Sequence, residues 1–253
     1  MANMHVVVDS LLTSYEVMGK GEVVVLLHGW GDRAAGLRGL QATLSDRRQV
    51  IAVDLPGFGG TQAPPEAWGL DEYAAFVGHF LEKIDAKPVQ AFVGHSNGGA
   101  IAIRGIAQGS LQTDRLVLLA SAGIRGEQKG KVGVLKMVAK AGKIASAPLP
   151  ARAKNSLRRK LYQTAGSDFL VAEQLQETFK RIMQDDVRMD ALKLHVPTLL
   201  VYGEQDMETP VRFGELFHEL IADSTLEVLP GAGHFVHLDR PTEVVRAIEE
   251  FVR

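Results

Sequence analysis

Residues 89–102 read VQAFVGHSNGGAIA, and this stretch decides the fold. Its first residues form a short apolar run typical of a buried strand, and an apolar helical pattern follows the glycines. Between them lies Gly94-x-Ser96-x-Gly98, with glycines where a sharp strand-to-helix turn leaves no room for a Cβ atom. Such a turn lifts the Ser96 hydroxyl above a sheet edge and points a helix N-terminus at it. We therefore interpret Ser96 as a nucleophile, with a purely structural glycine-rich turn as the alternative.

Similar apolar runs recur on both sides of this stretch. Several are continuously apolar rather than alternating, as expected for parallel strands buried on both faces. Helical patterns at Leu70–Ile84 and Pro241–Val252 lie between or after them. The alternation predicts an α/β fold with a doubly wound parallel sheet, and Val6–Val8 with Ser14–Met18 as an antiparallel hairpin at its edge. The predicted strands are Val6–Val8, Val23–Leu27, Val50–Val53, Val89–Val93, Leu116–Leu119, Thr198–Tyr202 and Leu226–Leu229.

The interval between residues 120 and 198 contains no convincing strand, although an ordinary crossover needs one helix and short loops. Its pattern instead predicts three helices, Lys131–Ala145, Ala151–Gln163 and Phe169–Met183. We therefore predict a core of residues 1–122 and 194–253, interrupted at residues 123–193 by an inserted helical cap, or lid.

The later strands are followed by the side chains that a serine nucleophile needs. A serine requires a base, and the base requires an orienting acid. In this sheet architecture the chain order is serine, acid, histidine, each just after a strand. Asp206 follows Thr198–Tyr202, and His234 follows Leu226–Leu229. Glu204, earlier in the same loop as Asp206, is the alternative acid.

Together these motifs resemble the α/β-hydrolase superfamily over essentially the whole chain. The resemblance implies a mostly parallel eight-stranded sheet flanked by helices, with a helical cap over the site. It also implies a catalytic triad of Ser96 as nucleophile, Asp206 as acid and His234 as base.

Two further loops resemble family motifs. His28-Gly29-Trp30-Gly31 resembles the oxyanion loop, which implies that the backbone N–H groups of Trp30 and Asn97 form the oxyanion hole. The Asp54–Gly59 stretch resembles the family's structural turn. Asn97 stands where relatives often carry an apolar residue, so the polarity of the pocket is open.

Substrate contacts are expected from the oxyanion loop, from the cap and from the turn Gly94–Gly98 that carries Ser96, which we call the elbow. His28 and His95 fit family positions, where they organise loops. The residues expected to contact substrate are Trp30, His95, Val134, Leu135 and Val138.

The predicted reaction is hydrolysis of a carboxylic ester of a small or medium apolar acyl group through an acyl-enzyme. Serine at the elbow argues against the dehalogenase and epoxide hydrolase branches, which use aspartate. Lactone, thioester or C–C bond hydrolysis and a cofactor-free perhydrolase remain alternatives with the same triad. A non-catalytic ligand sensor or signalling protein is the alternative from another class.

Composition narrows the remaining possibilities. The chain has 253 residues, 46% of them hydrophobic, a net charge of -2 and no cysteine. These values exclude wholesale disorder, a disulfide scaffold and a thiol nucleophile, and they argue against a nucleic-acid partner. Residues 125–160, however, carry a net charge of +10, and the rest carries -12. We favour a cap helix with a solvated lysine face; weak contact with an anionic membrane, or a preference for acidic substrates, is the alternative.

No cofactor or metal is predicted. His234 and His237 have a spacing compatible with metal binding, but no carboxylate cluster accompanies them, so packing is the favoured role of His237. Gly57–Gly60 is not followed by a helix opening, which makes it a weak dinucleotide motif. Met1–Val6 lacks the features of a signal peptide, and the cytoplasm is the expected location. Both a monomer and a homodimer are compatible with the sequence.

Overall fold

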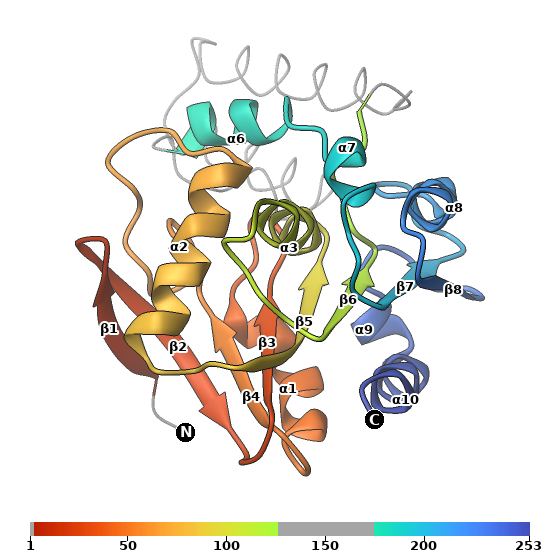
Figure 1. The fold of residues 1–253 in the computed structure, drawn as a ribbon, viewed down its shortest axis with the longest axis horizontal. Coiled ribbons are helices and arrows are strands. Elements are labelled where there is room, and N and C mark those ends of the chain that lie inside the picture. The colour runs from red at the N-terminus through yellow and green to blue at the C-terminus, as the bar shows by residue number, and fades with distance from the viewer. Residues whose placement is uncertain (1–2, 126–174) are drawn as a thin grey trace, which may run out of the picture.

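The computed structural model describes residues 3–125 and 175–253 and contains one eight-stranded sheet in these residues (Figure 1). The strand order across the sheet is β1-β2-β4-β3-β5-β6-β7-β8. The strands are β1 (Met4–Val8), β2 (Leu11–Met18), β3 (Val23–Leu27), β4 (Gln49–Val53), β5 (Val89–His95), β6 (Arg115–Leu119), β7 (Thr198–Gly203) and β8 (Ser224–Leu229).

The sheet is parallel from β4 to β8 and antiparallel at the β1 edge. β1 pairs antiparallel with β2, and β2 pairs antiparallel with β4. All other neighbours are parallel, and Val25 of β3 pairs with Ile51 on one side and Phe92 on the other. The predicted mostly parallel sheet and its antiparallel edge hairpin are therefore confirmed.

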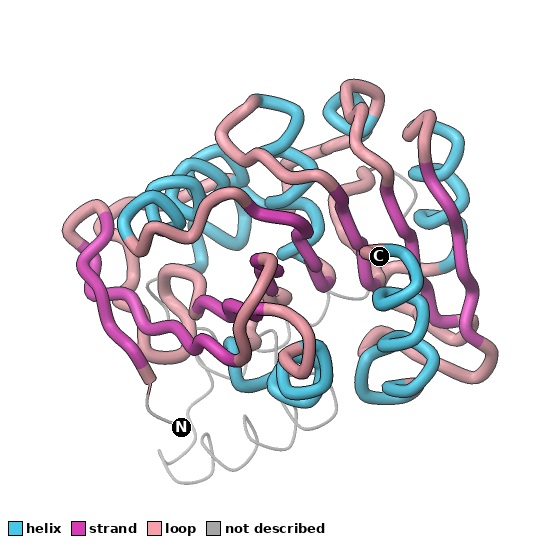
Figure 2. The backbone as a smooth tube through the Cα atoms, turned by 60° about the horizontal axis from the view of Figure 1, so that its bottom comes forward, coloured by secondary structure: helices cyan, strands magenta, loops and turns pink. Residues whose placement is uncertain are grey.

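Helices cover both faces of the sheet (Figures 1 and 2). Helices α2, α3 and α8 lie on one face, and α1 and α10 lie on the other. The helical segments are η1 (Ala34–Leu37), α1 (Arg38–Leu44), α2 (Leu70–Lys83), α3 (Asn97–Gln108), α6 (Gln176–Ile182), α7 (Arg188–Ala191), α8 (Val211–Leu220), α9 (Val236–Asp239) and α10 (Pro241–Phe251).

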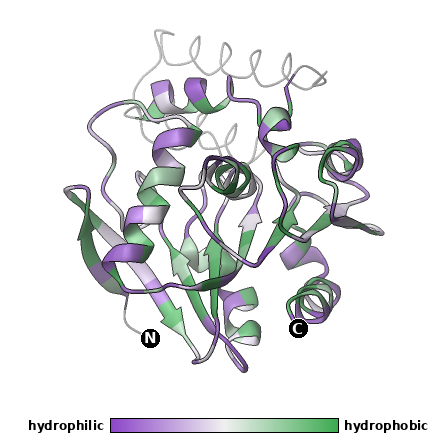
Figure 3. Ribbon diagram, viewed as in Figure 1, coloured by the Kyte–Doolittle hydropathy of each residue, from purple (hydrophilic) through white to green (hydrophobic). Residues whose placement is uncertain are grey.

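The central strands are mostly apolar because both of their faces are covered, and β3 is apolar at every position (Figure 3). In β3, Val25 and Leu27 belong to the core cluster beneath α2 and α3. Val24 and Leu26 belong to the separate cluster beneath α1 and α10. Successive side chains of a strand point to opposite faces, so one strand contributes to two cores. The rigid sheet thus provides fixed positions for the loops at its carboxyl edge.

The described part of the predicted cap begins at residue 175. There α6 lies near the amino end of α2, and α7 lies against α3, in the upper part of Figure 1. The expected helix Phe169–Met183 is described only in part, as α6, and the expected helices Lys131–Ala145 and Ala151–Gln163 lie outside the described residues. The division into core and cap at residues 123–193 stays a prediction. In the described ranges, no helix has the length and apolar character needed to span a membrane.

Candidate active site

Ser96 sits on a strained turn between β5 and α3. Its backbone has φ 50° and ψ −115°, a conformation that a non-glycine residue rarely adopts. A Cβ atom added to Gly98 would lie 2.2 Å from the carbonyl oxygen of Leu27, and one added to Gly94 would lie 2.6 Å from the Cα atom of Gly99. Both glycines are therefore required by the close approach of other backbone segments. The turn has the strand–elbow–helix context that the motif predicts.

The loop after β3 approaches the same turn. A Cβ atom added to Gly29 would lie 3.2 Å from the Cβ atom of Ser96. His28 anchors this loop, because its Nδ1 lies 2.7 Å from the Gly29 carbonyl oxygen and its Nε2 accepts the Leu55 N–H at 2.9 Å. Burial lowers the pKa of His28, so the ring is neutral and can make both contacts. Trp30 therefore lies in a loop that passes directly beside the predicted nucleophile, while Asn97 is the first residue of α3.

The predicted acid and base are in direct contact. His234 Nδ1 lies 2.9 Å from Asp206 Oδ2, and the two side chains are 8% and 0% exposed. Glu204, the alternative acid, instead accepts a hydrogen bond from the Gly231 N–H at 3.0 Å. The geometry thus assigns the contact with His234 to Asp206.

Asp206 is held ionised by its surroundings. Its Oδ1 accepts the backbone N–H groups of Glu208 at 2.8 Å and Thr209 at 2.9 Å. Burial raises the pKa of the Asp206 carboxyl, but hydrogen bonds from His234 and Thr209 outweigh burial and hold the pKa below its usual value. An ionised acid on Nδ1 fixes the imidazole with its proton on that nitrogen and leaves Nε2 able to accept another.

Thr209 is a residue of this site that the sequence reasoning did not identify. Its hydroxyl lies 2.7 Å from Asp206 Oδ2, 3.0 Å from His234 Nδ1 and 2.9 Å from the carbonyl oxygen of Ala120. It therefore connects the acid, the base and the end of β6. A threonine three residues after the predicted acid, directly before Pro210, was the available signal.

His95 links the elbow to the base. The ring is 1% exposed, and its Nε2 lies 3.0 Å from the His234 carbonyl oxygen. Burial and the neighbouring histidines lower the pKa of His95 well below its usual value, so the ring is neutral and donates through Nε2. This buried position suits a residue that holds the His234 loop against the elbow. Contact between His95 and a substrate stays a prediction.

His237 packs behind His95 rather than beside an open site. The centroids of the two rings are 4.9 Å apart, and His237 is 5% exposed. Neither of its ring nitrogens has a hydrogen-bond partner among the described residues, and burial lowers its pKa to about 4. In the two described ranges, no group of three or more histidine, aspartate or glutamate side chains could hold a metal ion.

Aromatic side chains connect the His28–Gly31 loop to α6. Trp30 packs edge-to-face on Phe58, with ring centroids 4.9 Å apart, and lies 5.2 Å from the ring of Phe179 in α6. The Phe58 turn is held by Asp54, whose carboxylate accepts the backbone N–H groups of Ala34 and Gly60. Phe179 is thus a further apolar neighbour of the site that sequence reasoning missed.

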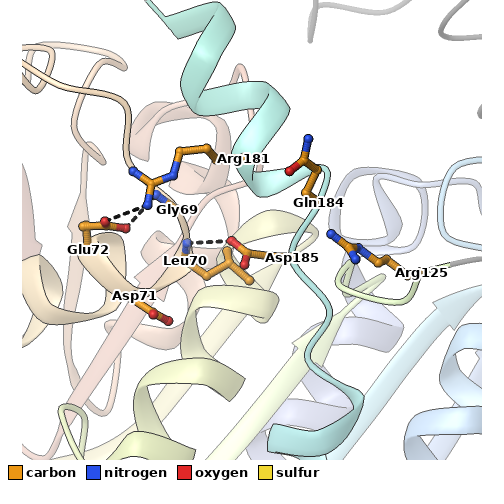
Figure 4. A pocket seen from close by; sticks show the side chains of 8 residues that line it. All are labelled: Gly69, Leu70, Asp71, Glu72, Arg125, Arg181, Gln184 and Asp185. Atoms are coloured by element: carbon orange, nitrogen blue, oxygen red, sulfur yellow. Dashed lines mark hydrogen bonds and ion pairs between the residues drawn. The ribbon is translucent and has the colours of Figure 1, made fainter.

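Polar contacts join α6 and α7 to α2 and α3 beside a cavity of about 240 Å³ (Figure 4). Arg181 of α6 pairs with Glu72 at 3.1 Å, and Asp185 accepts the Leu70 N–H at 3.0 Å. On α3, the largely buried Arg104 binds Asp190 of α7 at 2.7 Å. Ser96 does not line this cavity. We therefore interpret the cavity as part of the contact that holds α6 and α7 in place, separate from the candidate active site.

Comparison with known proteins now gives the family. A sequence model described as the alpha/beta hydrolase family matches residues 24–247, which is most of the chain. The chain belongs to the alpha/beta hydrolase family. The resemblance seen in its motifs and the predicted fold are both confirmed.

Relatives of this alpha/beta hydrolase have different named activities. It is 28% identical to 2-hydroxy-6-oxo-6-(2'-aminophenyl)hexa-2,4-dienoic acid hydrolase of Metapseudomonas resinovorans, over 95% of this chain and 87% of that one. It is also 28% identical to pimeloyl-(acyl-carrier protein) methyl ester esterase of Chromobacterium violaceum, over 93% and 96% of the two chains. Among solved structures, a serine hydrolase involved in carbazole degradation is 27% identical and matches with a TM-score of 0.77, covering 99% of this chain and 98% of that one.

Five residues were predicted to contact a substrate, and the structure describes two of them, Trp30 and His95. Val134, Leu135 and Val138 lie outside the described residues, as does nearly all of the basic segment 125–160. His95 directly precedes Ser96 in the chain, and Trp30 follows Gly29, the residue whose backbone approaches Ser96.

Proposed function

We propose that the chain is a serine hydrolase that cleaves carboxylic esters of small or medium apolar acyl groups. The observation that carries this proposal is the pairing of a strained Ser96 elbow with the buried Asp206–His234 pair. His95, next to Ser96, hydrogen-bonds the His234 backbone, so the three proposed catalytic residues belong to one sheet edge. Family membership supports hydrolysis as the reaction class.

In the proposed mechanism, Ser96 attacks the acyl carbonyl while Nε2 of His234 takes its proton. Asp206 holds the Nδ1–H and stabilises the imidazolium. The backbone N–H groups of Trp30 and Asn97 bind the oxyanion, and each such donor contributes about 2.7–4 kcal/mol to transition-state stabilisation. His234 then gives the proton to the leaving alcohol, and water hydrolyses the acyl-enzyme. Because His234 must be neutral to act as base, activity is expected to rise at about pH 6–7.

A series of p-nitrophenyl esters tests the proposal. We expect turnover by the wild type and a fall of at least about a thousandfold in kcat for Ser96→Ala. Ser110→Ala is the matched control, since Ser110 lies just beyond the other end of α3 and bonds the Gly105 carbonyl. Turnover that persists in Ser96→Ala excludes this nucleophile. A wild type inactive on every chain length excludes the esterase and leaves C–C bond hydrolysis and a ligand sensor as the candidates.

Hydrolysis of a C–C bond is the second candidate. It is supported by the 28% identity to the dienoic acid hydrolase of Metapseudomonas resinovorans and the 27% identity to the carbazole-degrading enzyme. The esterase of Chromobacterium violaceum is equally similar. Measuring kcat/KM for a 2-hydroxy-6-oxo-dienoate beside the ester series decides between the two. A higher kcat/KM for the dienoate makes C–C hydrolysis the main reaction.

A further inference from the structure

Two carboxylates flank the imidazole of His234, and the proposed mechanism uses one of them. Asp206 Oδ2 lies 2.9 Å from Nδ1. On the opposite side of the ring, Oε2 of Glu208 lies 3.6 Å from Nε2. Because Nδ1 is engaged by Asp206, Nε2 is the nitrogen that exchanges a proton with Ser96 and the leaving group. The second carboxylate therefore stands at the reacting nitrogen.

The loop after β7 holds Glu208 in this position. The Glu208 backbone N–H donates to Asp206 Oδ1 at 2.8 Å, so both carboxylates are fixed by one turn. Met207, between them, turns away and is 89% exposed. The Glu208 side chain is 52% exposed, so it is in contact with water while it faces Nε2. Its effect on His234 is therefore that of a partly screened charge.

The Thr209 hydroxyl also contacts His234, 3.0 Å from Nδ1. Aromatic rings pack against the imidazole as well. His95 of β5 and Phe235 have ring centroids 4.9 Å and 5.4 Å from that of His234. His237 of α9 packs against His95. Burial lowers the pKa of both His95 and His237, so these two rings are neutral in the pH range of activity.

The carboxylates of Asp206 and Glu208 lie 2.9 Å and 3.6 Å from the ring nitrogens Nδ1 and Nε2 of His234. Two further carboxylates lie nearby: Asp239 accepts the Gly233 N–H at 2.8 Å, and both Asp239 and Asp32 act electrostatically on His237.

We propose that Glu208 is a positioning and specificity-determining residue whose carboxylate favours the imidazolium form of His234 and disfavours a negatively charged leaving group. This inference rests on the proposed function, because it assumes that Nε2 is the reacting nitrogen. It assigns a preferred substrate class, esters whose leaving group is neutral or cationic.

The pH dependence has a definite sign. A carboxylate beside Nε2 stabilises the protonated ring, so His234 loses its proton at a higher pH than it would without Glu208. Removing the charge therefore moves the acidic limb of kcat/KM to lower pH. Two unit charges about 4 Å apart in a water-like environment change a protonation equilibrium about fivefold, which is a shift of about 0.7 pH unit.

Leaving-group selection follows from the same charge. A leaving group that carries a carboxylate brings this charge close to the Glu208 carboxylate when Nε2 protonates the departing oxygen, and the two negative charges repel each other. We expect the wild type to prefer p-nitrophenyl butyrate over the same ester with a carboxylate on the nitrophenyl ring. Glu208→Gln should narrow that kcat/KM ratio about fivefold at low salt.

The experiment compares wild type, Glu208→Gln, Glu208→Asp and Glu215→Gln. Glu215→Gln is the matched control, since it removes the same charge from an exposed position on α8. Each protein is measured in two ways. One is the pH profile of kcat/KM on the two esters. The other is the NMR titration of the His234 ring protons, assigned with His234→Gln, which requires no turnover.

We expect Glu208→Gln to titrate about 0.7 unit lower than wild type, with the aspartate variant between them and the Glu215 control unchanged. A Glu208→Gln midpoint within about 0.2 unit of the control overturns the inference, as does an unchanged ratio between the two esters. Failure of the proposed function gives a different result. In that case Ser96→Ala and wild type have the same kcat/KM on both esters, while the NMR titration of His234 still measures the effect of Glu208.

Discussion

Replacing Asp206 by Asn exchanges an acceptor for a donor in a group that accepts hydrogen bonds on both of its oxygens. Oδ1 receives two backbone N–H groups, and this oxygen is retained in Asn. Oδ2 receives the Thr209 hydroxyl at 2.7 Å and His234 Nδ1 at 2.9 Å, and the Asn NH2 group replaces it. The new amide forces His234 to accept on Nδ1 and to carry its proton on Nε2, so the ring can no longer accept the proton of Ser96.

The expected magnitude follows from this tautomer change. We expect kcat/KM for p-nitrophenyl butyrate to fall about 10⁴-fold, or about 5.4 kcal/mol of transition-state stabilisation. Folding stability should fall by about 1.5–3 kcal/mol, because charge-assisted hydrogen bonds to a buried carboxylate are lost. The assay is kcat/KM at pH 8, corrected for the folded fraction by urea unfolding. Glu204→Gln, which alters the alternative acid in the same loop, is the control.

Stability also depends on pH with a predictable sign. The pKa of Asp206 is lowered in the folded state, so its contribution is present above the unfolded value of 3.8 and is lost as the pH falls through the folded pKa. Wild type should therefore lose stability more steeply in this acid range than Asp206→Asn. A folded Asp206→Asn that keeps more than about a tenth of wild-type kcat/KM refutes the reasoning, as does an equal loss in Glu204→Gln.

Three further outcomes are expected. Gly98→Ala should lower the free energy of unfolding in urea by about 2–3 kcal/mol, because its Cβ would lie 2.2 Å from the Leu27 carbonyl oxygen. Gly39→Ala is the control, since a Cβ there meets open space and should not destabilise the fold. Equal free energies of unfolding for the two variants contradict the elbow geometry. Thr209→Val should lower kcat/KM about five- to tenfold by removing the hydroxyl between acid and base, and an unchanged value makes the hydroxyl dispensable. His237→Leu should raise stability by about 1 kcal/mol at pH 7.5, because the wild-type ring buries two nitrogens with no partner in the described residues. This stability advantage of His237→Leu over wild type should grow as the pH falls from about 6.5 towards 4. The reason is that the lowered pKa of His237 makes the folded wild type bind fewer protons than its unfolded chain. A stability advantage that shrinks towards acid pH contradicts this prediction.

The strands were predictable because burial on both faces leaves a continuous apolar run. Val23–Leu27 was placed correctly at both ends. Predicted ends elsewhere differ where strands finish in polar or partly exposed residues, as in β8, which begins at Ser224 rather than Leu226. Short α1 and the amphipathic α8 were not singled out, since neither has the long apolar pattern that marked Leu70–Ile84.

Some residues of the candidate site could likewise be predicted from the sequence, and others could not. Ser96, Asp206 and His234 were predicted from motif spacing and chain order, which are linear features of the sequence, and the triad that they form stays a proposal. Thr209 and Glu208 were not found, because their contacts with Asp206 and His234 depend on how one turn folds after β7. Neither residue belongs to a motif that identifies its role.

By itself, the sequence determined the α/β architecture, the position of the elbow and the order in which serine, acid and base follow their strands. These features depend on local periodicity and on glycines that no other residue can replace. Only the tertiary structure decided that Asp206 rather than Glu204 contacts His234, that His95 holds the His234 backbone, and that Glu208 faces Nε2. These are contacts between loops from different strands, and their distances are set by sheet packing, which no linear pattern records.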